Sequence, residues 1–174
     1  MFSKEKLELM LDKWIEQKKK ESARPDNGGV IGGGMMGAFG MFAVAPIILD
    51  NVDFLKRRIE RGDETFSKML LRLIDESGEK PSTIYNRANI DRRHFSKIAN
   101  HENYQPSKQT ALAFAIALKL DFDKTQKLLA TAGYTLGNSM LSDMIVSFFI
   151  EYKIYDVDLI NEFFYKYKIP LLGG

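Results

Sequence analysis

The stretch STIYNRANIDRRHFSKI at residues 82–98 decides the fold. Its apolar residues recur at helical spacing on both sides of a central break. They are Ile84, Ala88, Ile90, Phe95 and Ile98. Asn89, at the break, tolerates a left-handed backbone, and Asp91 just after it is a typical N-cap residue. The stretch therefore predicts two short helices, at about 81–88 and 91–99, that meet across a tight turn.

The second of these helices carries a polar face that would project outward. Its side chains are Arg92, Arg93, His94, Ser96 and Lys97. Cations and hydroxyl groups of this kind suit the phosphates and base edges of a nucleic acid. We therefore predict that this face contacts double-stranded DNA.

Helical periodicity continues on both sides of this stretch. We expect five helices between Asp63 and Ala132, of which the first closes at Gly78, the fourth spans 108–120 and the fifth spans 123–132. Ser107 is placed to cap the fourth, and Leu112, Ala115 and Ile116 should join the same core. Two more helices are expected at 140–152 and 157–167. Their aromatic side chains form either a core between them or a dimer seam: Phe148, Phe149, Tyr152, Phe163, Phe164 and Tyr167.

The first part of the chain predicts one more helix. Leu7, Met10, Leu11, Trp14 and Ile15 recur at helical spacing within residues 3–20, and the helix would end in the basic run at 18–20. Such an amphipathic helix packs on protein or lies on a membrane. Trp14 is accordingly either a packing anchor or a membrane-interface residue.

Residues 28–49 are rich in glycine and contain no charged side chain. Gly29, Gly33 and Gly37 would share one face of a helix, where small residues allow close approach between backbones. Phe39 and Phe42 add apolar surface that should be buried against protein or lipid. We predict that the segment drives association into a homo-oligomer or insertion into a membrane. The glycine pattern at 32–37 follows no strand, so it does not indicate a dinucleotide site.

The amino-acid composition and the absence of catalytic motifs exclude several classes of function. The chain has 25 Lys and Arg against 23 Asp and Glu, and it has no cysteine. Disulfides, thiol catalysis and cysteine-ligated metals are therefore excluded, and a cytoplasmic location is expected, with membrane association through residues 1–49 as the alternative. No nucleophile–base pair, phosphate-binding loop or metal motif is present, so we expect neither enzymatic activity, nor a cofactor, nor a metal site.

Residues 63–137 resemble the Xre family of λ-repressor-like helix-turn-helix domains. The resemblance rests on residues 82–98, on Gln105-Pro106-Ser107 before an alanine-rich helix, and on Leu120-Asp121-Phe122-Asp123 opening the next. It implies a bacterial or phage transcription regulator that binds DNA as a dimer. The positions that fall where the family contacts DNA are Thr83, Arg92, Arg93, His94 and Lys97. Tyr85 stands where the family has a small residue, and the loop at 100–105 is longer than the family's turn.

A looser resemblance leads to a second interpretation. The chain is also similar to a helical module found at the C-termini of bacterial macro-domain proteins and of stress- or defence-linked proteins. It would then be a membrane-active or self-assembling effector, of the kind used in phage defence, with the helical domain as sensor or scaffold.

The sequence as a whole thus predicts an all-α protein. Its expected parts are an amphipathic helix at 1–24, the glycine-rich segment at 25–50, a basic connector at 51–62, the helix-turn-helix domain at 63–137 and a helical pair with a tail at 138–174.

Overall fold

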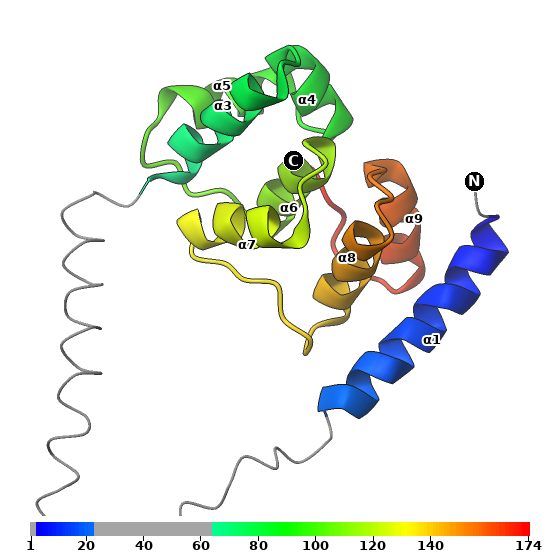
Figure 1. Cartoon of the computed structure of the whole chain (residues 1–174). Helices are drawn as coiled ribbons and strands as arrows, with labels where there is room; N and C mark the ends of the chain where they lie inside the picture. The colour runs from blue at the N-terminus through cyan, green and yellow to red at the C-terminus, as the bar shows by residue number, and fades with distance from the viewer. Residues whose placement is uncertain (1–2, 23–63) are drawn as a thin grey trace, which may run out of the picture. The chain divides into compact units, whose positions relative to one another are not determined.

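The computed structural model describes residues 3–22 and 64–174. These residues contain eight α-helices and no strand, so the all-α prediction is confirmed. The helices belong to one compact unit (Figure 1). The glycine-rich segment at 25–50 and the connector at 51–62 lie outside the described residues.

Helices fill the interval from Thr65 to Ala132 as expected, with no strand among its residues. Their bounds are α3 (Phe66–Ser77), α4 (Pro81–Arg87), α5 (Arg92–Asn100), α6 (Lys108–Ala117) and α7 (Phe122–Thr131). The side chains of Thr65, Asp91, Ser107 and Asp121 each accept a backbone N–H in the first turn of the helix that follows. These caps satisfy N–H groups that have no partner within the helix, which explains where four of the helices begin.

One helix is shorter than expected. The predicted helix at 108–120 ends at Ala117, because Lys119 takes a left-handed backbone with φ of 54°. The amide of Leu120 then returns to the carbonyl of Ala115. A left-handed residue often ends a helix in this way, and it is usually glycine, but here it is a lysine.

The predicted core of α4, α5 and α6 is largely confirmed. Seven of the eight expected side chains are buried: Ile84, Ala88, Ile90, Ile98, Leu112, Ala115 and Ile116. Phe95 is only half-buried, but it packs against the same cluster. The core continues into α8 (Leu141–Glu151) and α9 (Val157–Lys166), where Phe148, Phe149, Phe163 and Phe164 are fully buried. Tyr152 remains exposed and Tyr167 is half-buried, so the aromatic set is only partly core.

Helix α1 (Lys4–Ser22) lies alongside α8 and packs on it (Figure 1). Leu7, Leu11, Trp14 and Ile15 are buried by this contact. The indole of Trp14 donates to the carboxylate of Glu151 at 3.1 Å and meets the ring of Phe148 edge-on at 5.9 Å. Trp14 is therefore a packing anchor. The helix runs through the lysine run at 18–20 instead of ending there.

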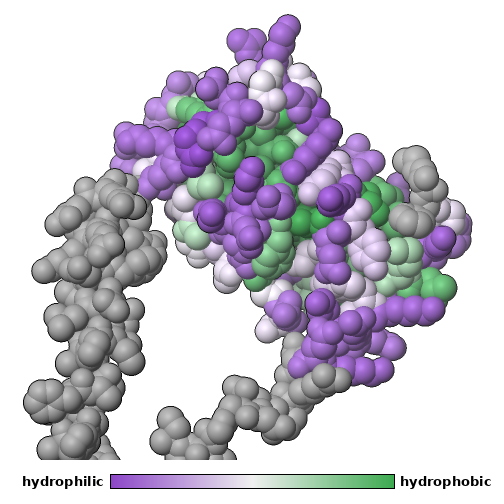
Figure 2. Space-filling view, in the orientation of Figure 1, coloured by the Kyte–Doolittle hydropathy of each residue, from purple (hydrophilic) through white to green (hydrophobic). Residues whose placement is uncertain are grey.

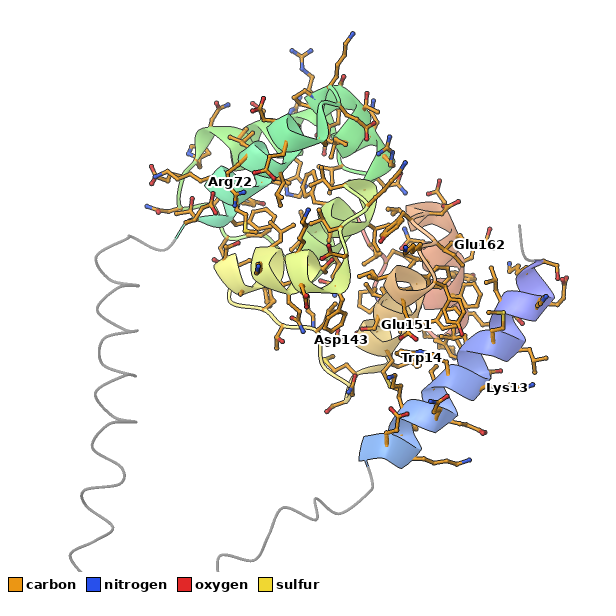
Figure 3. All side chains as sticks on the ribbon, viewed as in Figure 1. Lys13, Trp14, Arg72, Asp143, Glu151 and Glu162 are labelled. Carbon is orange, nitrogen blue, oxygen red and sulfur yellow. The ribbon has the colours of Figure 1, made fainter. Side chains whose placement is uncertain are left out.

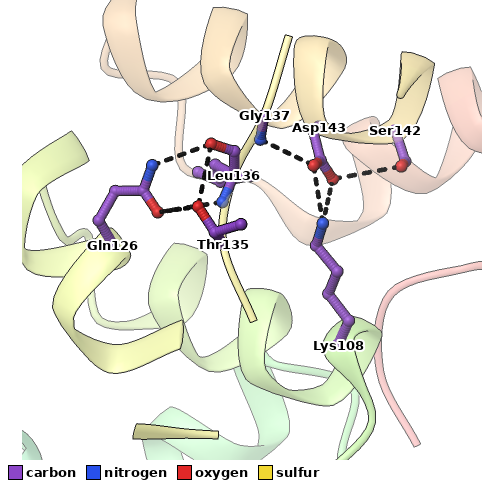
Figure 4. A network of polar contacts seen from close by, with 7 residues as sticks. All are labelled: Lys108, Gln126, Thr135, Leu136, Gly137, Ser142 and Asp143. Carbon is purple, nitrogen blue, oxygen red and sulfur yellow. Dashed lines mark hydrogen bonds and ion pairs between the residues drawn. The ribbon is translucent and has the colours of Figure 1, made fainter. Parts of the chain in front are cut away.

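A buried ion pair joins α6 to α8 (Figure 4). Asp143 is 2% exposed and lies 2.7 Å from the ammonium group of Lys108. The same carboxylate accepts the amide of Gly137 at 2.9 Å. Nearby, the side chain of Gln126 bonds to the backbone of Leu136 on both its oxygen and its nitrogen. These contacts fix the segment between α7 and α8, which has no helical hydrogen bonds of its own.

The last residues of the described chain run back from α9 towards α6 (Figure 1). Asn161 holds Leu172 through two hydrogen bonds, of 2.7 and 3.0 Å. The hydroxyl of Thr110 donates to the carbonyl of Gly173, and the amide of Gly174 donates to the carbonyl of Asn89. The tail thus contacts the turn between α4 and α5.

Candidate nucleic-acid interface

The turn between α4 and α5 sets the direction of α5. Asn89 has a φ of 54°, as its residue type predicted, and the amide of Ile90 donates to the carbonyl of Tyr85 at 2.9 Å. The side chain of Asn89 also donates to Asp158 at 2.6 Å. Hydrogen bonds to α4 and to α9 therefore hold this turn in place.

Asp91 caps α5 as predicted. Its carboxylate accepts the amides of Arg93 at 2.7 Å and His94 at 2.9 Å. These hydrogen bonds, that from His94 foremost, hold the pKa of Asp91 below its usual range, because they stabilise the ionised form. The capped terminus keeps Arg92 and Arg93 in the first turn of the helix.

A charged bridge fixes α4 against α6. The guanidinium of Arg87 meets both carboxylate oxygens of Glu79, at 3.0 and 2.6 Å, and donates to the carbonyl of Ala117 at 2.7 Å. The hydrogen bond from Arg87 lowers the pKa of Glu79. Arg87 therefore has a structural role, although it lies within the stretch that decides the fold.

The outward face of α5 gathers exposed polar side chains. Arg92, Arg93, Ser96 and Lys97 line a shallow open depression together with Asp91, Asn100 and His101. Figure 2 shows that hydrophilic side chains predominate on the visible surface of α3 to α5. Within residues 3–22 and 64–174, none of Arg92, Arg93 and Lys97 forms an ion pair. Apart from the attraction between Arg93 and the carboxylate of Asp91, their charges are available to a ligand.

Three residues of this depression were not among the predicted contacts: Asp91, which was predicted as the N-cap, Asn100 and His101. Asn100 donates from its side-chain amide to the hydroxyl of Ser96 at 3.0 Å, and His101 follows the helix. Helical spacing could have identified Asn100, because it lies one turn beyond Ser96 and Lys97 on the same face of the helix.

His94 is not on the outward face. Its ring is half-buried, bonds to the hydroxyl of Tyr104 at 2.9 Å, and lies against Gly174. An α-helix turns by roughly 100° per residue. His94 is two residues from both Arg92 and Ser96, so its side chain points to the opposite side of α5. The structure thus brings Arg92, Arg93, Ser96 and Lys97 together but leaves His94 out. Thr83 is exposed on α4 and does not line the depression.

The large side chain of Tyr85 and the long loop after α5 are both accommodated by local contacts. Tyr85 is accommodated because its ring stacks on Phe95, with 5.1 Å between centroids. The loop after α5 is tied down: Ser67 donates to the carbonyl of His101 at 3.0 Å, and Gln105 donates to the carbonyl of Ala132. The larger side chain thus packs on α5, and the longer loop is held by α3 and by the residue that follows α7.

The predicted association and membrane residues are placed only in part. Gly29, Gly33, Gly37, Phe39 and Phe42 lie outside the described residues. The apolar side of α1 is occupied by α8, so in this structure it does not present an apolar stripe to lipid. None of the helices within 3–22 and 64–174 has the length and apolar character of a membrane span.

Comparison with known proteins adds no relative. No protein-family model, curated protein or solved structure matches the chain. Within the described part of the chain, no group of three or more histidine and carboxylate side chains is arranged to hold a metal ion.

Proposed function

We propose that the protein is a helix-turn-helix DNA-binding regulator, and not an enzyme, in which α5 enters the major groove. The observation that carries the proposal is the exposed face of α5, where Arg92, Arg93 and Lys97 form no ion pair among the described residues. A duplex presents phosphate charge along both edges of a groove wide enough for a helix. We also propose that α3 to α7 are arranged as in a λ-repressor-like domain.

Each part of the site would have a distinct task. Arg92 and Arg93, in the first turn of α5, reach the phosphates or the base edges near the groove entrance. Ser96, Lys97 and Asn100 continue the same face deeper along the helix, where hydroxyl and amide groups read base edges. Asn89 positions the helix, and Asp91, although it lines the depression, uses its carboxylate to cap the amides of Arg93 and His94.

We further propose that two copies bind together. One short recognition helix reads few base pairs, and dimers of such domains extend the site to two half-sites about one helical turn apart. Residues 28–49 are our proposed source of association, on the basis of their glycine spacing and apolar composition.

The test uses the full chain and a labelled pool of random duplexes at several salt concentrations. For the unaltered protein, affinity should fall steeply with salt, because each phosphate contact releases counterions. The double variant Arg92→Glu with Arg93→Glu should bind at least about tenfold more weakly, with a salt slope smaller by about two.

A matched control reverses two other exposed cations, Lys124 and Lys127 of α7, which do not line the depression. Lys124→Glu with Lys127→Glu changes the net charge equally and should keep most of the affinity. The proposal fails if the unaltered protein shows no salt-sensitive affinity for any duplex, or if both double variants lose affinity equally.

A further inference from the structure

A second hollow lies away from α5, where α1 meets the start of α7 and the end of α8. Its volume is about 400 Å³. The floor is largely apolar, because Trp14 and Ile150 are 7% and 5% exposed, and the ring of Phe122 stands at the edge. Figure 3 shows Trp14 beside Glu151 at the contact between α1 and α8. The volume is near the lower end of the range for small-molecule sites, which indicates a metabolite and not a peptide.

Two hydroxyl groups that have no hydrogen-bond partner among the described residues line the same hollow. Ser147 is 7% exposed, and its hydroxyl makes no hydrogen bond to any described residue. The hydroxyl of the half-buried Tyr155 likewise has none, and burial raises the pKa of this phenol. Among the described residues, only the hydroxyl of Thr125 is both enclosed and unpaired, so the hydroxyls of Ser147 and Tyr155 open onto the hollow and can bond to a group from outside the chain.

Charges of both signs surround the opening. Asp121 and Glu151 supply two carboxylates, and Lys18 and Lys153 supply two ammonium groups. Lys18 lies over the Trp14 ring, 5.4 Å from its centroid, and pairs with Glu21 at 3.4 Å. Lys153 forms no ion pair among the described residues. A ligand with a single charge would meet an unfavourable side chain as well as a favourable one, whereas a ligand with both charges can pair each of its ends.

We propose that this hollow binds a small zwitterion with an apolar side group, the chemistry of a free apolar amino acid. The ammonium group would lie at Asp121 and Glu151, and the carboxylate at Lys153. The side group would cover Trp14 and Ile150, with Ser147 bonding to one of the polar ends. This site does not depend on DNA binding by α5.

Trp14 makes the test direct, because it is the only tryptophan of the chain and forms part of the floor. The full-length protein is titrated with L-leucine and with L-phenylalanine while tryptophan emission is recorded. We expect a saturable change in intensity or wavelength below about 10 mM ligand. Isopentylamine and 4-methylpentanoate, which keep the apolar group but carry one charge only, should bind at least about tenfold more weakly.

Variants of exposed residues separate the two ends of the ligand, and glutamine at position 151 keeps an oxygen that can accept the hydrogen bond of the Trp14 indole. Glu151→Gln and Lys153→Met should each raise the apparent dissociation constant about tenfold, whereas Glu162→Gln, outside the hollow, should leave it unchanged. Circular dichroism of each variant checks folding. No saturable change with either amino acid overturns the proposal, and so does equal binding of the singly charged analogues.

Discussion

Thr125 of α7 is fully buried, and its hydroxyl has no hydrogen-bond partner among the described residues. An unpaired buried hydroxyl is unfavourable by about 1–3 kcal/mol. Valine has the same branched shape and a similar helix propensity. We therefore expect Thr125→Val to raise the free energy of unfolding by about 1 kcal/mol in urea denaturation.

Thr131, in the same helix, provides the matched control for this substitution. Its hydroxyl donates to the carbonyl of Leu128 at 2.6 Å. Thr131→Val removes a satisfied hydrogen bond and should lower the free energy of unfolding. A loss of stability in Thr125→Val comparable to that in Thr131→Val would show that the buried hydroxyl has a partner after all.

Asp91 gives the start of α5 a pH dependence. Its pKa is lowered in the folded protein, chiefly by the amide of His94. Its stabilising effect is therefore complete above the unfolded-state pKa and is lost as the pH falls through the folded-state value, below about pH 4. Asp91→Asn keeps a capping side chain but cannot titrate.

We thus expect Asp91→Asn to be less stable than the unaltered protein near neutral pH, and the difference to vanish under acid. Urea denaturation of both proteins from about pH 7 to about pH 2 measures this difference. Asp91→Ala, which removes the cap, should be less stable at every pH. A difference between Asp91→Asn and the unaltered protein that stays constant with pH would contradict the assigned titration.

At the scale of whole elements, the sequence predicts the helices better than their ends. Each helix has an apolar stripe of helical spacing, and residue types such as Asn89, Asp91 and Ser107 have a known preference for turns and caps. Lys119 has no such preference, since lysine rarely adopts a positive φ. It does so because Leu118 and Leu120 pack on the core on either side of it. The end of α6 follows from these tertiary contacts, which helical periodicity does not contain.

The packing of α1 leads to a prediction about one of its two faces. Leu11 is 0% exposed against the neighbouring helices, whereas Leu9 on the same helix is 57% exposed. Leu11→Ala should lower the free energy of unfolding by about 2–5 kcal/mol, whereas Leu9→Ala should change it by no more than about 0.5 kcal/mol. Trp14 emission in urea reports the transition, because the indole leaves Phe148 and Glu151 when α1 separates. Equal effects of the two substitutions would mean that α1 is not packed on α8 in solution.

At the scale of the whole molecule, the sequence predicted the type of surface at the candidate interface but not all of the residues that form it. Arg92, Arg93, Ser96 and Lys97 follow from the outward side of one helix. His94 does not, because its position depends on Tyr104 and on Gly174, which arrives from the far end of the chain. The hollow beside Trp14 was not predicted either, since its walls come from α1, α7, α8 and the loop after α8. Contacts between distant segments have no local sequence pattern.

Residues 28–49 connect α1 to the helices that begin with α3, and their composition carries the last prediction. A flexible linker usually contains charged or hydroxyl residues that keep it hydrated, but this segment contains glycine and apolar residues such as Phe39 and Phe42. Exposed apolar surface is unfavourable by roughly 25 cal/mol per Å², so we expect the segment to associate with other copies or with lipid. Gly33 and Gly37 would permit close approach on one helical face.

Gly33→Leu with Gly37→Leu should therefore lower the mass of the assembly or abolish binding to vesicles, because two large side chains would separate the neighbouring backbones. Gly33→Ala with Gly37→Ala is the milder control and should retain more of the association, since alanine is also small enough for close approach. Light scattering measures the assembly, flotation with vesicles of zwitterionic and anionic lipid measures membrane binding, and salt-dependent DNA affinity shows whether α5 still functions. If mass and flotation are the same in the leucine variant as in the unaltered protein, the segment is a tether. Any pairing of two copies on DNA must then come from another surface. The apolar side of α1 is not that surface, because it is packed against α8.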